Sequence, residues 1–160
     1  ETTTNLIGNG TLALMRHPDQ LSRLRGDLGL MPSAIDEMLR FDCPVQSTVR
    51  TCSVPTNIGG TDIAAGELVF VILAAANRDP LKFTDGDTLD IARRPNEHIA
   101  FGEGIHFCLG ANLARMEGEI AIASMLERFP KLRLADAEAP LEYRGSYLLR
   151  GLKALPLATA

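Results

Sequence analysis

The residues whose types and spacing best suit chemistry lie in a glycine-rich stretch at 101–110, which reads FGEGIHFCLG. Its three glycines permit positive φ angles and a close backbone approach to a flat or bulky group. Cys108 directly precedes a segment with helical periodicity, where unpaired N–H groups and the helix dipole favour a thiolate over a thiol. Metals bind cysteine as the thiolate, so Cys108 is a candidate metal ligand.

Two other interpretations of Cys108 follow from the residues alone. A free cysteine at a helix start is most often a small, inert core residue. A zinc site would need further Cys or His ligands, and only His106 is close in the sequence, so zinc fails on ligand number. A single thiolate presented by a glycine loop suits one axial bond to a haem iron. The core residue and the haem ligand both remain open on this evidence.

Two charged features upstream could support such a site. Glu37 and Arg40 are spaced i and i+3, so on a helix they share a face and can pair; an exposed pair of this kind would contribute little to stability. Arg50 lies among β-branched residues, where it needs an anionic partner unless it sits on a solvated strand edge. We expect the remaining cysteines, Cys43 and Cys52, to be structural.

The elements that must position these residues follow from the hydrophobic pattern. A helix over 109–129 carries two apolar stripes, so we expect much of its circumference to be buried. The stretch at 74–100 has turn residues and no periodicity, and irregular segments of that length are usually functional. The same pattern predicts helices over 1–16, from 18 onward and over about 32–41, and short strands near 45–51, 58, 63, 68–72, 132–134, 147–149 and 155–157.

Composition excludes several classes of protein. The chain has 160 residues, enough for about one domain, and its 46% hydrophobic and 22% charged residues are typical of a soluble globular protein. A net charge of −4 and an aromatic content of 5% make nucleic acid an unexpected partner. The longest apolar run, 68–76, is too short to cross a bilayer. With no disulfide framework and no signal segment at its start, we expect a cytoplasmic protein.

The stretch at 101–110 resembles the haem-binding loop of the cytochrome P450 family, the haem-thiolate monooxygenases, whose signature is F-G-x-G-x-H/R-x-C-x-G. Every fixed position of that signature is filled. The resemblance covers essentially all of residues 1–160 and implies a mainly α fold with small β-sheets (α+β), from the middle of the family's I helix to the C-terminus. It implies that 1–160 form the C-terminal part of one monooxygenase domain of the soluble bacterial type, whose N-terminal part is missing.

The resemblance also implies a cofactor, haem b (iron protoporphyrin IX), and residues that hold it. Cys108 corresponds to the proximal ligand of the iron. Arg50 and His106 correspond to residues that hydrogen-bond the haem propionates, with a solvated strand edge and a loop surface as the alternatives. Phe101 corresponds to the aromatic residue that packs beside the thiolate and shields it. The complete cofactor-binding set is Arg50, Phe101, Gly102, His106, Cys108 and Gly110.

A structural triad is implied beside this loop. Glu37 and Arg40 correspond to the family's buried K-helix pair, which is joined by an arginine from the irregular segment before the cysteine. Arg93 best matches that third partner, and Arg78 is its rival. Burying such a cluster costs much desolvation, so the loss of one member should be severe.

The remaining assignments concern protons, substrate and redox partner. Glu1 and Thr2 correspond to the acid–alcohol pair that delivers protons in the family's distal helix; a threonine-rich helix end is the alternative. Two segments correspond by position to substrate contacts, with ordinary strand packing as the alternative. Their candidate residues are Val45, Gln46, Ser47, Thr48, Tyr147 and Leu148. Arg115 is a candidate contact for the redox partner.

The function implied by the resemblance is a haem-dependent monooxygenase. It would insert one oxygen atom from O2 into a small organic molecule, by hydroxylation or epoxidation, with electrons from a ferredoxin- or flavodoxin-type donor. No nucleic acid and no membrane are implied. One alternative is a peroxygenase of the same family, which uses hydrogen peroxide and needs no electron donor. The other is a non-catalytic fragment that is unable to hold haem.

Overall fold

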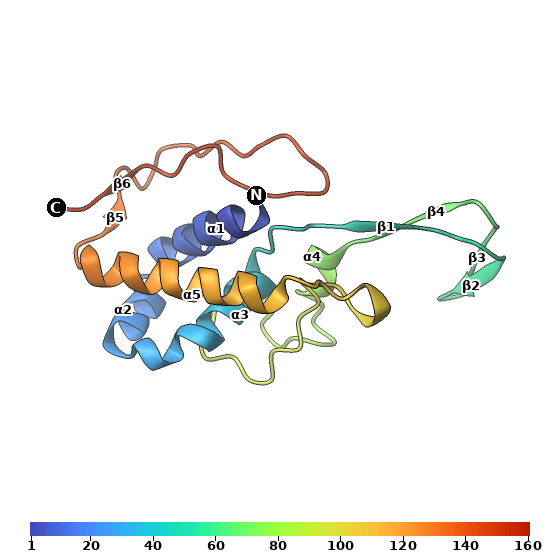
Figure 1. The fold of residues 1–160 in the computed structure, drawn as a ribbon, viewed down its shortest axis with the longest axis horizontal. Helices are drawn as coiled ribbons and strands as arrows, with labels where there is room; N and C mark the ends of the chain where they lie inside the picture. Colours follow the sequence, from blue (N-terminus) through green and yellow to red (C-terminus); the bar gives the residue numbers. More distant parts are fainter.

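Four helices form the body of the molecule, and the computed structural model describes residues 1–160. α1 packs against α2, α3 and α5, and α3 also packs against α5 (Figure 1). A fifth helix, α4, is a single short turn of chain near the start of the irregular segment. The helices are α1 (Thr2–Arg16), α2 (Pro18–Gly26), α3 (Met31–Phe41), α4 (Leu73–Ala76) and α5 (Ala111–Arg128), with 3₁₀ turns η1 (Leu28–Leu30) and η2 (Gly104–His106).

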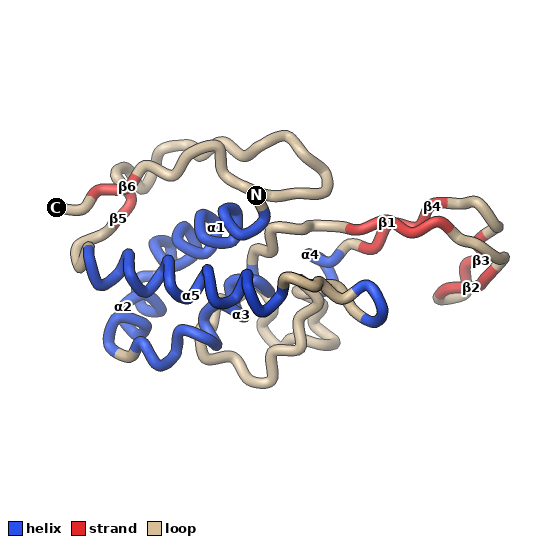
Figure 2. The backbone as a smooth tube through the Cα atoms, viewed as in Figure 1, coloured by secondary structure: helices blue, strands red, loops and turns tan.

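The strands form three separate antiparallel pairs (Figure 2). β1 pairs with β4, with Arg50 opposite Val69. The β2–β3 hairpin lies at the tip of an arm that extends away from the helices (Figure 1), and β5 pairs with β6 near the C-terminus. Helices with small sheets confirm the expected fold class. The strands are β1 (Thr48–Thr51), β2 (Thr56–Ile58), β3 (Thr61–Ile63), β4 (Leu68–Val71), β5 (Arg133–Leu134) and β6 (Leu157–Ala158).

Proline and glycine explain several helix boundaries and contacts. Pro18 is the first residue of α2, and Pro32 lies in the first turn of α3, positions where the missing N–H costs nothing. Gly10 weakens α1 as an isolated helix, but a Cβ there would lie 2.6 Å from Sδ of Met38. A Cβ at Gly118 of α5 would lie 3.2 Å from Cδ1 of Ile35. These glycines let the helices approach closely.

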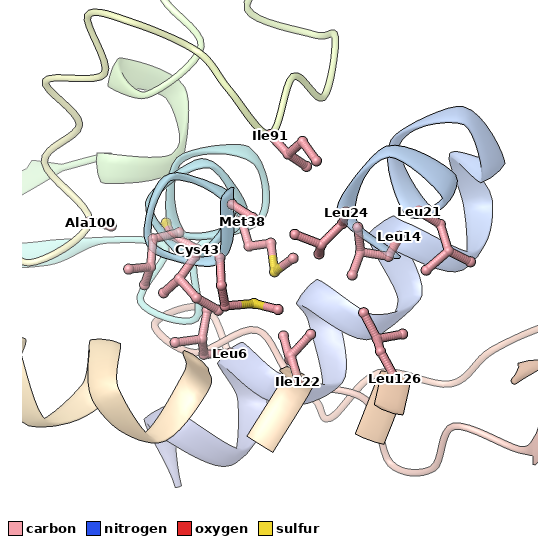
Figure 3. Packing of buried hydrophobic residues seen from close by; sticks show 14 residues of the cluster. Leu6, Leu14, Leu21, Leu24, Met38, Cys43, Ile91, Ala100, Ile122 and Leu126 are labelled. Carbon is pink, nitrogen blue, oxygen red and sulfur yellow. The ribbon is translucent and has the colours of Figure 1, made fainter. Parts of the chain in front are cut away.

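The core lies where α1, α2, α3 and α5 meet (Figure 3). Leu14, Ile35 and Ile122 have no exposed surface, and Met38 is 1% exposed. Side chains of this kind each contribute about 1.5–3 kcal/mol when fully buried. Because every one of these helices supplies part of the cluster, the core holds α3 and α5, which flank the cysteine loop, in a fixed relation.

Two expectations about the C-terminal half are wrong. One apolar stripe of α5 is exposed rather than buried, with Leu113, Met116 and Ile120 between 52% and 61% exposed, because no segment of residues 1–160 packs on that face. The stretch at 147–149 forms no strand; it makes only an isolated bridge between Leu149 and Val45. No helix is long and apolar enough to cross a membrane.

Candidate functional site

The Cys108 loop folds back on itself and leaves the thiol exposed. Gly102 and Gly104 take φ angles of +77° and +68°, which favour glycine. The Cys108 N–H donates to the carbonyl oxygen of Phe101 at 2.9 Å, and the Phe107 N–H donates to that of Gly104 at 3.0 Å. α5 begins only at Ala111, so Cys108 precedes the helix rather than lying in its first turn. Cys108 is a free, exposed cysteine, which removes the alternative of a buried core residue.

An open cavity of about 350 Å³ borders the thiol. Apolar side chains from α1, α3 and α4, including Leu6, Leu39 and Leu73, form much of its wall. Nine residues singled out from the sequence share this cavity. They are Thr2, Val45, Thr48, Arg50, Phe101, Gly102, His106, Cys108 and Gly110.

Two basic side chains lie at the cavity without a carboxylate partner. Arg50 is exposed on β1, and its Nη1 donates to Oγ1 of Thr48 and to the carbonyl oxygen of Val49, both at 2.9 Å. His106 is exposed in η2 and makes no ion pair. The Arg50 guanidinium can pair strongly with a carboxylate, and a ring N–H of His106 can donate to one. The site can therefore accept an acidic group beside the thiol.

Behind the loop lies a fully buried ion pair. The side chains of Glu37 and Arg40 have 0% exposure, and Nε and Nη2 of Arg40 donate to the two oxygens of Glu37 at 2.8 Å. Nε of Arg93 donates to Oε1 of Glu37 at 3.1 Å. Arg78 lies elsewhere, stacked on the Phe41 ring and paired with Asp87. The structure thus brings together the three residues proposed as a triad.

The other hydrogen bonds of the Arg40 guanidinium go to the irregular segment. They meet the backbone carbonyls of Asn77, Gly86 and Thr88 at 2.8, 2.7 and 3.1 Å. These contacts tie α3 to a stretch that has almost no regular structure. Buried charges are tolerable only when paired and fully hydrogen-bonded, and this pair meets that condition.

Asn77 extends this cluster toward the cysteine loop and was not singled out from the sequence. It is fully buried. Its carbonyl oxygen accepts from Arg40, and its Oδ1 accepts from the Ile99 N–H at 2.8 Å. Ile99 in turn accepts from the Gly102 N–H at 2.9 Å. Asn77 therefore connects the buried ion pair to the start of the loop.

Arg115, a predicted contact for the redox partner, also bonds Asp36 and packs on the Phe101 ring. Its Nε donates to Oδ1 of Asp36 at 2.7 Å, and its guanidinium carbon lies 4.7 Å from the Phe101 ring centroid. The side chain is 30% exposed. Asp36 and its second partner, His98, were also not singled out, because no local pattern links residues so far apart in the chain.

The structure places the two residues of the expected acid–alcohol pair, Glu1 and Thr2, in different surroundings. Thr2 borders the cavity. Glu1 does not, and its exposed carboxylate instead lies 3.4 Å from Nη1 of Arg144. A direct role for Glu1 at the cavity is therefore not supported by this placement, whereas Thr2 is in position.

The two substrate-contact segments lie against each other. The Gln46 N–H donates to the carbonyl oxygen of Leu148 at 2.8 Å, and Oγ of Ser47 donates to that of Tyr147 at 3.3 Å. Only Val45 and Thr48 of the six candidates border the cavity. For the others, strand-like packing between the segments accounts for their positions.

The residues present fit a haem. No group of three or more His, Cys, Asp or Glu side chains gathers in a metal-binding cluster within residues 1–160, so these residues do not by themselves complete the ligands of a metal at Cys108. A porphyrin supplies them. Apolar walls suit its ring, and Arg50 and His106 suit its carboxylates.

Comparisons with known proteins agree with this chemistry. The family model described as Cytochrome P450 matches residues 22–151. Cytochrome P450 107B1 of Saccharopolyspora erythraea is 51% identical over 158 residues, which are 98% of this chain. The cytochrome P450 monooxygenase PikC of Streptomyces venezuelae is 49% identical over 158 residues, again 98% of the chain.

Solved structures give the same result. P450BioI in complex with an acyl carrier protein that bears hexadec-9Z-enoic acid superimposes with a TM-score of 0.96 at 46% identity, covering 100% of this chain and 41% of that one. The tirandamycin C-bound monooxygenase TamI gives 0.96 at 47% identity, covering 99% and 40%. The chain spans 39% of the length of P450 107B1 and 38% of PikC. With the signature loop, the fold and the family model in agreement, the chain belongs to the cytochrome P450 family.

Proposed function

We propose that this chain is the C-terminal part of a haem-thiolate monooxygenase that inserts one oxygen atom from O2 into a small organic molecule. The observation that carries the proposal is the exposed Cys108 thiol at a cavity that also presents Arg50 and His106. Two similar proteins, PikC and TamI, are themselves named monooxygenases.

Each residue at the cavity has a defined task in this proposal. Cys108 would hold the iron of haem b as its thiolate ligand and would donate electron density to it. Arg50 and His106 hold the propionates by charge-assisted hydrogen bonds. When bound, haem would supply the redox-active iron that the O2 chemistry requires. Phe101 lines the same cavity as Cys108 and would pack beside the sulfur, which affects the reduction potential.

Thr2 is the residue placed to handle protons. Thr2 borders the cavity, and a threonine hydroxyl can both accept and donate a hydrogen bond. Glu1 is adjacent in the chain but lies outside the cavity, with its exposed carboxylate beside Arg144. The proposal therefore assigns proton handling at the cavity to Thr2 and leaves Glu1 at the solvent side.

Substrate, partner and location follow from the same assignment. The apolar wall that includes Leu6, Leu39 and Leu73 suits an apolar or moderately polar small molecule. Electrons come from a ferredoxin- or flavodoxin-type donor. The cysteines are all free thiols, as is usual in the reducing cytoplasm, where we place the protein.

A ferrous–CO spectrum of the full-length protein that contains these residues tests the proposal. Wild-type protein should show a thiolate-type band and hydroxylate a test panel of small molecules. Cys108→Ser should lose both, because an alcohol does not replace the thiolate donor. Cys52→Ser, which changes a half-buried cysteine away from the cavity, should keep both. Retained hydroxylation in Cys108→Ser would refute the assignment.

The alternative function is that of a non-catalytic fragment, in which the isolated 160 residues cannot hold haem. Leu113 borders the cavity and is 53% exposed, so no segment of residues 1–160 covers the cavity at this side chain. We expect the isolated chain to retain haem weakly or not at all. Stoichiometric, thiolate-type binding by these residues alone would overturn that expectation.

A further inference from the structure

A carboxylate on α3 joins three separate parts of the chain around the cysteine loop. Oδ1 of Asp36 accepts a hydrogen bond from Nε of Arg115 on α5 at 2.7 Å. The same oxygen lies 3.3 Å from Nε2 of His98, in the irregular segment. Asp36 directly precedes Glu37 in the chain, yet it contacts a different set of partners.

The protonation of His98 follows from its surroundings. Its Nδ1 accepts a hydrogen bond from the Ala100 N–H at 3.2 Å. In the neutral ring the proton must then lie on Nε2, where it points to Asp36. The side chain is only 2% exposed, so this orientation is held from both ends.

Both partners of Asp36 contact the Phe101 ring. The Arg115 guanidinium carbon lies 4.7 Å from the ring centroid, within the range of a cation–π interaction. The His98 ring lies 6.0 Å from it, tilted by 51°. The carbonyl oxygen of Phe101 accepts the Cys108 N–H at 2.9 Å. The backbone of Phe101 is therefore bonded to the cysteine, while its ring is held by Arg115 and His98.

The charge state of Asp36 is consistent with a held position. Burial alone would raise the pKa of this carboxyl, but hydrogen bonds from His98 and Arg115 and the charge of Arg115 outweigh burial and lower the pKa below its ordinary value. Asp36 is therefore ionised at neutral pH. An ionised carboxylate is the strongest available acceptor for the two donors.

We infer that Asp36 is a positioning residue: through Arg115 and His98 it holds Phe101 in place beside Cys108. An unanchored arginine on a helix surface samples many rotamers, whereas one held at Nε keeps its cation over the ring. The inference rests on the proposed role of Cys108 as the iron ligand. Its consequence is that a residue which touches neither sulfur nor haem tunes the reduction potential.

A double-mutant cycle in the full-length holoprotein tests this. Asp36→Asn keeps the shape of the side chain and removes its charge, and is made in the wild type and in Phe101→Leu. In the wild-type background we expect about a 3- to 10-fold change in the ferric–ferrous equilibrium, or about 30–60 mV at 59 mV per tenfold, together with a shift of the ferrous–CO band. In the Phe101→Leu background most of that change should disappear, because no ring remains to be held.

Two controls separate positioning from charge. Asp87→Asn removes an exposed carboxylate that pairs with Arg78 and does not contact Phe101, so it should leave the band unmoved. Asp36→Glu keeps the charge and should largely restore the wild-type potential. If Asp36→Asn does not fold, the cycle is run with Arg115→Lys, which keeps the charge but loses the planar group that covers the ring.

Each outcome has one meaning. A potential shift that persists undiminished in Phe101→Leu, or that Asp87→Asn reproduces, refutes the positioning role while the iron ligand stands. A wild-type holoprotein without a thiolate-type spectrum refutes the proposed function instead, and the inference with it. A shift confined to the background that has Phe101 supports the inference.

Discussion

The buried ion pair of Glu37 and Arg40 and the loop of Cys108 are neighbours with opposite surroundings. The pair is fully buried, and its remaining donors meet carbonyl groups of the same 160 residues. The thiol is exposed at an open cavity, beside apolar side chains that nothing in the chain covers. Residues 1–160 thus satisfy the buried ion pair fully, whereas they form an open wall around the thiol.

This contrast predicts where substitutions act. A buried charge whose partner is removed has no solvent to replace it, so changes at the pair should cost folding stability. Exposed side chains at the cavity contribute little to folding, so changes there should alter ligand binding only. Four substitutions test whether stability and ligand binding depend on different residues. Their expected effect on the free energy of unfolding decreases from the first to the last.

The largest effect is expected for Arg40→Ala. It leaves the Glu37 carboxylate buried with only Arg93 as a charged partner, a change that typically costs about 3–5 kcal/mol. Urea unfolding of the full-length protein measures the loss, and haem incorporation should fail. Arg23→Ala is the matched control, since its pair with Asp90 is about half exposed and should cost no more than about 1 kcal/mol. A stable, haem-loaded Arg40→Ala protein would contradict the argument from burial.

A smaller effect is expected for Asn77→Ala, which acts between the two regions. Truncation leaves the Ile99 N–H without its side-chain acceptor, at a cost of about 1–3 kcal/mol. Because Ile99 in turn bonds Gly102, hydrogen exchange of the Gly102 amide should also accelerate. Asn57→Ala, which removes an exposed amide that donates to Asp62, serves as the control and should leave this exchange unchanged. Unchanged exchange at Gly102 in Asn77→Ala would show that the support and the loop are independent.

The difference between the two regions also explains what the sequence could predict. The helices over Thr2–Arg16 and Met31–Phe41 follow from periodicity and proline placement, and the glycine signature locates Cys108. These signals are local. Of the partners of Glu37 in the irregular segment, only Arg93 was predicted, and only through the family resemblance, which favoured it over Arg78. The Asn96 amide, which donates to Oε2 of Glu37 at 3.2 Å, was not.

What could not be predicted depends on contacts across long stretches of chain. Asp36 meets Arg115 across 79 positions and His98 across 62, and neither pair forms a pattern that a single sequence reveals. Backbone carbonyls, such as that of Asn77 toward Arg40, carry no sequence signal at all. The exposed stripe of α5 was mispredicted because an apolar face shows that something covers it, not that the covering segment lies within these residues.

A still smaller effect concerns acid stability and Asp36. Its pKa lies below the ordinary value of 3.8, so its contribution to stability is present above that pH and is lost as pH falls through the lower value. Asp36→Asn should therefore lose less than about 1 kcal/mol at pH 7, since the side chain is 35% exposed, and should differ least from wild type in strong acid. Unfolding curves at pH 7 and pH 3 measure the difference. An Asn variant whose deficit grows toward acid would reverse the predicted sign.

The smallest effect on folding, and the sharpest test of the contrast, is expected for Arg50→Ala. The side chain is exposed and makes hydrogen bonds only within its own strand, so unfolding of the haem-free protein should change by no more than about 0.5 kcal/mol. Haem loss should nevertheless become at least about tenfold faster, because a charge-assisted hydrogen bond to a propionate contributes about 1.5–3 kcal/mol. Transfer of haem to an acceptor protein measures that rate, with Arg144→Ala, an exposed arginine away from the cavity, as the control. Equal rates of haem loss in the two variants would mean that Arg50 is an ordinary strand-edge cation, and the cavity would then lack its main contact for an acidic group.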